Sequence, residues 1–165
     1  MSFAFSIDTS QPPADFYAEL AAATDALLTG EADPIANAAN LSALLFAAVP
    51  DLNWAGFYFL KDGELVVGPF QGLPACVRIP LGKGVCGTAA ATLKTQRVAD
   101  VEQFPGHIAC DSASRSELVI PLVDNGRLLG VLDLDSPRAD RFSADDEAGL
   151  VRVAQAYVHS VTVSS

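Results

Sequence analysis

The chain has 165 residues, half of them hydrophobic, and carries a formal net charge of −10. That length suits one domain, residues 1–165, with a sizeable core. No apolar run approaches the roughly 20 residues of a membrane span, and the N-terminus lacks the basic and apolar stretches of a secretory signal, so we expect a cytoplasmic protein. Ten Lys and Arg scattered among 20 acids disfavour nucleic acid and anionic membranes as partners.

Two helices are expected at the start of the chain. Apolar residues at helical spacing predict the first over residues 13–29, with Gly30 as its stop. The second has Asp33 as its N-cap and Pro34 at the first helical position, and runs toward Pro50.

Strand patterns bounded by turn residues follow, over residues 54–61, 64–67, 76–80, 117–123 and 127–135. Asp62-Gly63 and Asn125-Gly126 are strong hairpin signals between neighbouring strands. A short helix is expected over 85–95, and an irregular polar loop over 100–116, of a length that is usually functional or disordered.

The last helix is expected to start at Ser143, with Asp146 completing a capping box. These elements together indicate an α+β fold. We expect an antiparallel sheet flanked by N- and C-terminal helices.

Three cysteines, Cys76, Cys86 and Cys110, suggest sulfur chemistry, because an odd thiol count in a reducing compartment argues for reactive sulfur or a metal. Cys86 lies in a glycine-rich turn into a helix, where the field at the helix N-terminus would favour the thiolate. His107 near Cys110 would lower the pKa of that thiol and Asp111 would raise it, if either lies close in space. A Cys3His zinc site is a further reading, although the close cysteine pairs of such sites are missing.

Two other patterns point toward a site. Strand periodicity places Asp133 and Asp135 on one face of 127–135, together with Leu129 and Val131, and buried carboxylates need a cation, a proton or water. Trp54 and Tyr58 share a face of the first strand with Gly56 between them. That arrangement is read either as ordinary core packing or as a box for a small polarizable group.

At this point the chain resembles a known family, the free methionine-(R)-sulfoxide reductases, which are built on the GAF fold. The resemblance covers roughly residues 13–158 and includes all three cysteines at the family's relative spacing. It rests on six runs: 53–58, 68–76, 82–87, 104–112, 116–119 and 132–136. Arg115 departs from the small polar residue expected there.

The resemblance implies that Cys110 is the nucleophile that attacks the sulfoxide sulfur and becomes a sulfenic acid. Cys76 is then the resolving thiol, with Cys86 as the alternative or auxiliary resolver. Thioredoxin would reduce the resulting disulfide, so that no bound cofactor is expected. A homodimer is also expected, since GAF domains often pair.

The residues themselves account for the remaining requirements of this reaction. Clustered Glu117, Asp133 and Asp135 would keep one carboxyl protonated to protonate the sulfoxide oxygen, while the ionised acids would hold the α-ammonium of a free amino acid. We favour Glu117 or Asp135 as proton donor and Asp133 as an orienting group. Trp54 and Tyr58 would enclose the S-methyl group. The rival hypotheses are a non-catalytic GAF sensor and a zinc-stabilised interaction module.

Overall fold

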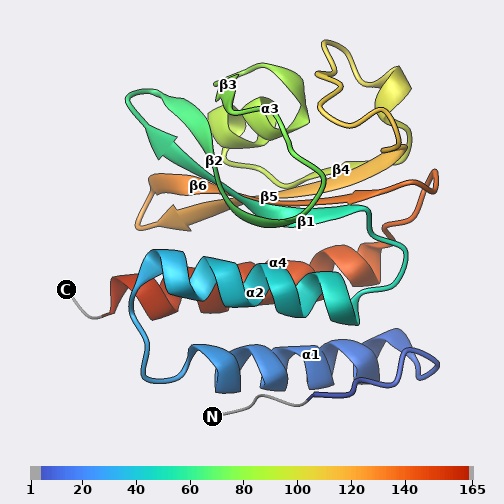
Figure 1. The fold of residues 1–165 in the computed structure, drawn as a ribbon, viewed down its shortest axis with the longest axis vertical. Helices are drawn as coiled ribbons and strands as arrows, with labels where there is room; N and C mark the ends of the chain where they lie inside the picture. The colour runs from blue at the N-terminus through green and yellow to red at the C-terminus, as the bar shows by residue number, and fades with distance from the viewer. Residues whose placement is uncertain (1–4, 164–165) are drawn as a thin grey trace.

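A six-stranded antiparallel sheet divides the molecule into two unequal halves (Figure 1). The structure is a computed structural model and describes residues 5–163. The strand order is β3-β2-β1-β6-β5-β4. The strands are β1 (Trp54–Lys61), β2 (Glu64–Gly72), β3 (Arg78–Pro80), β4 (Gln96–Val98), β5 (Ser116–Asp124) and β6 (Arg127–Ser136).

Three helices cover one face of this sheet, and a fourth covers the other. In Figure 1, α2 (Pro34–Ala48) and α4 (Ala144–Thr162) lie directly beneath the sheet and α1 (Pro13–Leu28) lies below them. The main core fills this half, with side chains from all three helices and from β1, β5 and β6. The short α3 (Gly84–Thr92) and the 3-10 turn Val101–Gln103 lie in the opposite half. The α+β architecture expected from the sequence is confirmed.

Local capping explains where α2 and α4 start. The Asp33 side chain accepts hydrogen bonds from the backbone N–H groups of Ile35 and Ala36, which satisfies two free donors of the first turn of α2. At α4, Ser143 and Asp146 form the reciprocal capping box that the sequence predicts.

The elements β2, β3, β4 and α3 depart most from what the sequence predicts. β2 continues to Gly72 rather than ending at residue 67, β3 begins at Arg78 rather than 76, and α3 covers 84–92 rather than 85–95. Gly68 and Pro69 interrupt the strand pattern, so the sequence does not predict that β2 continues beyond them. The pairing of β1 with β2 shifts its register between Gly56 and Tyr58, and this irregularity accommodates the two residues. The three-residue β4 is too short to give a periodic pattern and was not predicted.

One face assignment on β6 was wrong. Leu129 packs in the helix-side core and not beside Asp133, and Leu128 packs on the opposite side. The cause is a bulge, since Leu122 pairs with Gly130 and Val123 with Leu128, which leaves Leu129 without a partner in the ladder. Beyond the bulge the alternation of two holds through Asp135.

Within residues 5–163, no helix has both the length and the apolar character needed to cross a bilayer.

Asp146 ties three parts of the helical half together, and its loss should therefore be costly. It caps α4, accepts a hydrogen bond from the Tyr17 hydroxyl of α1 (2.6 Å) and pairs with Arg141 (3.0 Å). We expect Asp146→Ala to lower the free energy of unfolding by about 2–3 kcal/mol, because it removes a cap and leaves a partly buried hydroxyl and cation without partners. Urea denaturation checks this. Asp145→Ala, an exposed neighbour in the same turn, is the control and should change stability far less.

Candidate active site

The register of three central strands gathers the functional side chains of the open face. Glu117 of β5 lies directly opposite Asp135 of β6, which lies opposite Trp54 of β1. Two residues along, Asp133 lies between Val119 and Gly56. Because side chains alternate along a strand, all three carboxylates and the indole project from the same face.

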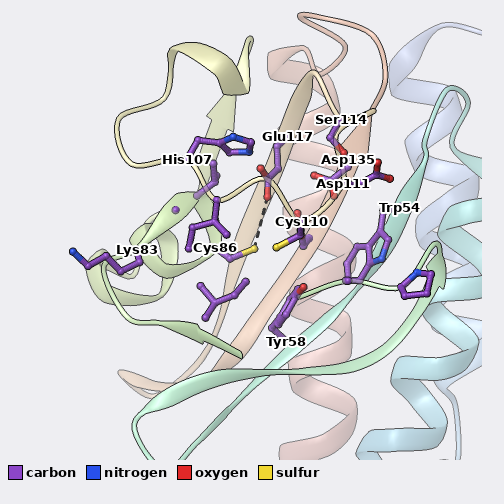
Figure 2. A pocket seen from close by; sticks show the side chains of 17 residues that line it. Trp54, Tyr58, Lys83, Cys86, His107, Cys110, Asp111, Ser114, Glu117 and Asp135 are labelled. Atoms are coloured by element: carbon purple, nitrogen blue, oxygen red, sulfur yellow. Dashed lines mark hydrogen bonds between the residues drawn. The ribbon is translucent and has the colours of Figure 1, made fainter. Parts of the chain in front are cut away.

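A cavity of about 40 Å³ lies above this row of side chains (Figure 2). Its other walls come from the start of α3, from the segment before Cys76 and from the loop that carries Cys110. Seven of the eight site residues predicted from the sequence line it: Trp54, Tyr58, Cys86, Cys110, Glu117, Asp133 and Asp135. The eighth, Cys76, is joined to the cavity through its sulfur.

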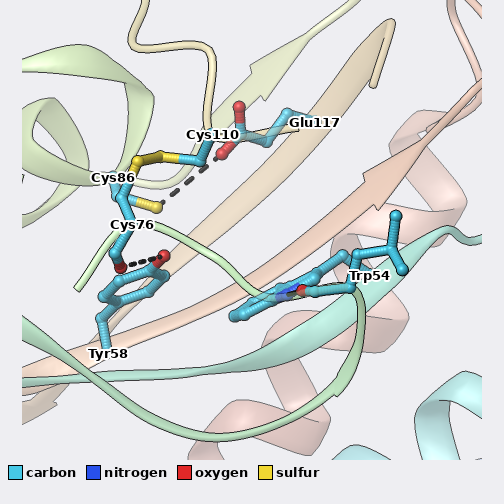
Figure 3. Close-up of a disulfide and its surroundings, with 7 residues drawn as sticks. Trp54, Tyr58, Cys76, Cys86, Cys110 and Glu117 are labelled. Carbon is cyan, nitrogen blue, oxygen red and sulfur yellow. Dashed lines mark hydrogen bonds between the residues drawn. A yellow bond between two sulfur atoms is a disulfide. The ribbon is translucent and has the colours of Figure 1, made fainter. Parts of the chain in front are cut away.

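A disulfide links Cys76 and Cys110, whose Cα atoms are 5.3 Å apart (Figure 3). This is the pair that the resemblance implied. Cys86 is the free cysteine and is buried beneath them. The Cys3His zinc reading is not realised, because two of its thiols are consumed by the disulfide.

The two aromatic residues do more than line the cavity. Trp54 donates from Nε1 to the backbone carbonyl of Leu73 (3.2 Å), and the Tyr58 hydroxyl donates to the carbonyl of Cys76 (3.1 Å). The rings stack on each other at 5.7 Å between centroids, and Phe70 stacks on Trp54 at 5.0 Å. These contacts fix the segment that carries Cys76 against β1.

Asn53 anchors the opposite segment, which carries Cys110. Its Nδ2 donates to Asp111 Oδ2 (3.0 Å) and to Ser114 Oγ (3.1 Å). Its backbone N–H donates to the carbonyl of Asp135 (3.0 Å). Asn53 and Ser114 were not predicted as site residues, and Asp111 was considered only for its effect on the pKa of the Cys110 thiol. A polar residue directly before a predicted strand was the only available signal for Asn53.

The three acids are held in conditions that favour their neutral forms. Glu117 and Asp133 are only 7% and 5% exposed, and Asp135 is partly exposed. Burial raises the pKa of Glu117 well above its ordinary value, and the charges of Asp133 and Asp135 add to the effect. Burial also raises the pKa of Asp133, to about 6, and that of Asp135. Desolvation, rather than the mutual repulsion that we expected, is the leading cause.

The expectation for Cys86 was wrong. Its position at the start of α3 suggested a favoured thiolate, but burial, together with the charges of Asp133 and Glu117, raises the pKa of its thiol well above the ordinary value. The side chain is 4% exposed, and its Sγ lies 3.7 Å from Glu117 Oε1 as a donor. Cys86 is therefore a neutral thiol in this state.

Cys86, Glu117 and Asp133 also form the one group of potential metal ligands found among residues 5–163, with ligand atoms within 4.8 Å of one another. One sulfur and two carboxylates would suit Zn²⁺ in type. The same acids face the cavity, where they could bind an ammonium group instead of a metal ion.

Two other side chains at the cavity are cationic or can become so. Lys83 points outward from the rim, whereas His107 lies above the acids (Figure 2). Arg115 does not line the cavity and pairs with Asp100 at 3.6 Å.

Comparison with known proteins bears on this constellation. The GAF domain family model matches residues 27–158. The chain is 56% identical over 136 residues to the free methionine-R-sulfoxide reductase of Escherichia coli, covering 82% of each protein. It is 44% identical over 139 residues to the enzyme of that name from Saccharomyces cerevisiae, covering 79% of this chain and 77% of the other.

The solved structures agree with the sequence relatives. A free methionine-R-sulfoxide reductase of Neisseria meningitidis, in complex with its substrate, superposes with a TM-score of 0.92 at 41% identity and covers 98% of this chain and 96% of its own. The chain belongs to the free methionine-R-sulfoxide reductase family of GAF domain proteins. As a member of that family it is an enzyme, an oxidoreductase.

The raised pKa values have a consequence for stability in this reductase. A carboxyl group whose pKa is raised on folding stabilises the fold below its unfolded pKa, and that contribution is lost as pH rises through the folded value. For Asp133 the window runs from about 4 to about 6. Stability of the oxidised protein should therefore fall as pH rises across this window.

Glu117→Gln tests whether ionisation of a buried carboxyl group in the site destabilises the fold, because an amide cannot ionise. We expect the variant to exceed the original protein in unfolding free energy by about 1–3 kcal/mol at pH 8. The gain should disappear at pH 4, and urea denaturation at both pH values measures it. Glu19→Gln, on the exposed side of α1, controls for the exchange itself. An equal gain at both pH values would contradict a buried, destabilising charge.

Proposed function

We propose that this enzyme reduces free L-methionine-(R)-sulfoxide to L-methionine by way of a cysteine sulfenic acid and an intramolecular disulfide. The observation that carries the proposal is the convergence of Cys110 with three carboxyl groups, two of them buried, in a single cavity. Attack on a sulfoxide requires both a thiolate and a proton for the departing oxygen. Carboxyl groups with raised pKa values are suited to supply that proton near neutral pH.

In the first step, the Cys110 thiolate attacks the sulfoxide sulfur while Glu117 or Asp135 protonates the oxygen. The oxygen and this proton pass to the Cys110 sulfur as a sulfenic acid, and methionine is released. The donor recovers its proton from solvent. Asp133, which lies two residues from Asp135 on the same face, orients the other two acids.

In the second step, the Cys76 thiol condenses with the sulfenic acid, forms the disulfide and releases water. The disulfide of the structure corresponds to the enzyme after this step. Cys86 is a poorer candidate for the resolving thiol, because its raised pKa keeps it protonated among the acids.

Selection of the free amino acid follows from the same cluster. Ionised members would bind an α-ammonium group, which a methionine residue within a protein lacks. Trp54 and Tyr58 would enclose the S-methyl group and select the (R) epimer by shape. Thioredoxin in the cytoplasm would supply the two electrons that restore the thiols, so that the reaction needs no bound cofactor.

The closed disulfide leaves little room for the substrate. A cavity of about 40 Å³ holds a few water molecules, each needing ~10–15 Å³. We therefore expect the loop that carries Cys110 to move when the enzyme is reduced. Calorimetry should detect methionine sulfoxide binding to reduced Cys110→Ser protein and at least tenfold weaker binding to the oxidised original. Equal affinities would contradict a loop that closes the site.

Turnover decides the function. NADPH oxidation with thioredoxin and thioredoxin reductase should occur with free methionine-(R)-sulfoxide but not with the (S) epimer or a peptide-bound sulfoxide. Cys110→Ser should abolish it, because Cys76 does not line the cavity and the raised pKa of Cys86, which does, keeps that thiol protonated. Stoichiometric binding without turnover, by folded and reduced protein, would favour a GAF sensor instead.

Removal of the resolving thiol separates the two steps. Cys76→Ser should release about one methionine per protein in a burst and then turn over at less than a hundredth of the original rate with thioredoxin. Cys86→Ser, the matched cysteine control, should retain steady turnover. The reverse pattern would make Cys86 the resolver.

A further inference from the structure

The charge of this acidic protein is unevenly distributed along the chain. Residues 65–99 contain no Asp or Glu but hold four of the ten basic residues, Arg78, Lys83, Lys94 and Arg97. Two of the four are paired with acids from outside this segment, Arg78 with Glu64 at 2.7 Å and Arg97 with Glu147 at 2.8 Å. All 20 acids lie in the rest of the sequence. This acid-free segment builds most of β2 together with β3, α3 and β4, and it includes Cys76.

Exposed apolar side chains lie close to the disulfide in sequence and in the fold. Leu73 is 66% exposed and Val77 63%, and they flank Cys76 on either side. Ile108, 37% exposed, precedes Cys110 by two residues and would touch any Cβ placed on Gly84 of α3. Leu73, Val77 and Ile108 are here called the rim patch.

Hydrogen bonds hold the backbone that carries Leu73 and Val77 of the rim patch. The carbonyl of Leu73 accepts from Trp54, that of Cys76 from Tyr58, and that of Val77 from the backbone N–H of Val67 (2.9 Å). These hydrogen bonds fix the backbone at Leu73, Cys76 and Val77, and the side chains of Leu73 and Val77 are exposed to solvent. Two large apolar side chains held outward beside a redox-active sulfur indicate a contact surface.

We propose that the rim patch, together with Lys83 at the rim of the cavity, is the docking surface for the protein that reduces the Cys76–Cys110 disulfide. The partner is a dithiol protein of the thioredoxin class, with an apolar surface and acidic residues around its attacking cysteine. Apolar contact would supply affinity, and Lys83, which points outward from the rim of the cavity, would attract an acidic partner. The inference rests on the proposed function, in which this disulfide must be reduced in each cycle.

The geometry favours Cys76 as the sulfur that is attacked. It lies between Leu73 and Val77, whereas Cys110 is followed by Asp111 and faces the buried acids, which would repel an incoming thiolate. The partner's thiolate forms a bond to Cys76 Sγ, the original S–S bond breaks, and Cys110 leaves as a thiolate. The partner's second thiolate then attacks its own bonded sulfur, releases Cys76 to take a proton from water, and leaves the partner as a disulfide.

The test compares two reductants on the same variants. Leu73→Asn combined with Val77→Thr should raise the KM for thioredoxin at least fivefold. Turnover supported by dithiothreitol should stay unchanged, because a small dithiol needs no docking surface. Lys83→Gln should raise the same KM two- to threefold and weaken its dependence on salt. Ile35→Asn, an equally exposed apolar residue on α2 behind the sheet, is the control and should change neither reaction.

The outcomes separate this inference from the proposed function. An unchanged KM for thioredoxin in the double variant, with folding intact by urea denaturation, would overturn the docking surface alone. An original protein that fails to turn over with dithiothreitol would overturn the proposed function. Thioredoxin with its second cysteine replaced by serine should be trapped on Cys76, as peptide mapping would show. Trapping on Cys110 would overturn the assignment of the attacked sulfur.

Discussion

The placement of three carboxyl groups, two buried and one partly buried, on one face of the sheet is the constraint on which the rest of the structure depends. Charged forms of these groups are expensive in a desolvated site, so this half of the molecule contributes less to stability than its apolar residues suggest. The opposite half compensates with a core shared by three helices and the sheet. Stability and chemistry are thus assigned to opposite faces of the same strands, and alternation of side chains keeps them apart.

The reactive groups are carried by two kinds of support. Glu117, Asp133 and Asp135 project from central strands paired on both sides, which fixes their spacing. The two linked sulfurs lie outside the strands, Cys76 on a segment held against β1 and Cys110 on the loop that we expect to move when the disulfide is reduced. Rigid acids and movable sulfur suit a cycle in which one thiol must meet first a substrate and then a second thiol.

Much of this could be predicted from the sequence, for reasons visible in particular residues. Capping at Asp33 and Ser143 and the hairpin turns are local signals, and they gave the helices and most strands. The shared face of Asp133 and Asp135 followed from a period of two. The bulge at Leu129 and the strand β4 were missed because each depends on a partner strand. The state of Cys86 was missed because its burial among acids is a tertiary property that outweighs the field of its own helix.

Asn53 has a consequence for how the site opens. One side-chain amide holds the Cys110 segment at both Asp111 and Ser114, while the backbone of the same residue is bonded to Asp135. Rotation of that single amide would break both hydrogen bonds at once, so these two contacts would be lost together. The loop would then exchange between a held and a released conformation. The fraction of molecules in the released conformation would govern how often the cavity admits a ligand.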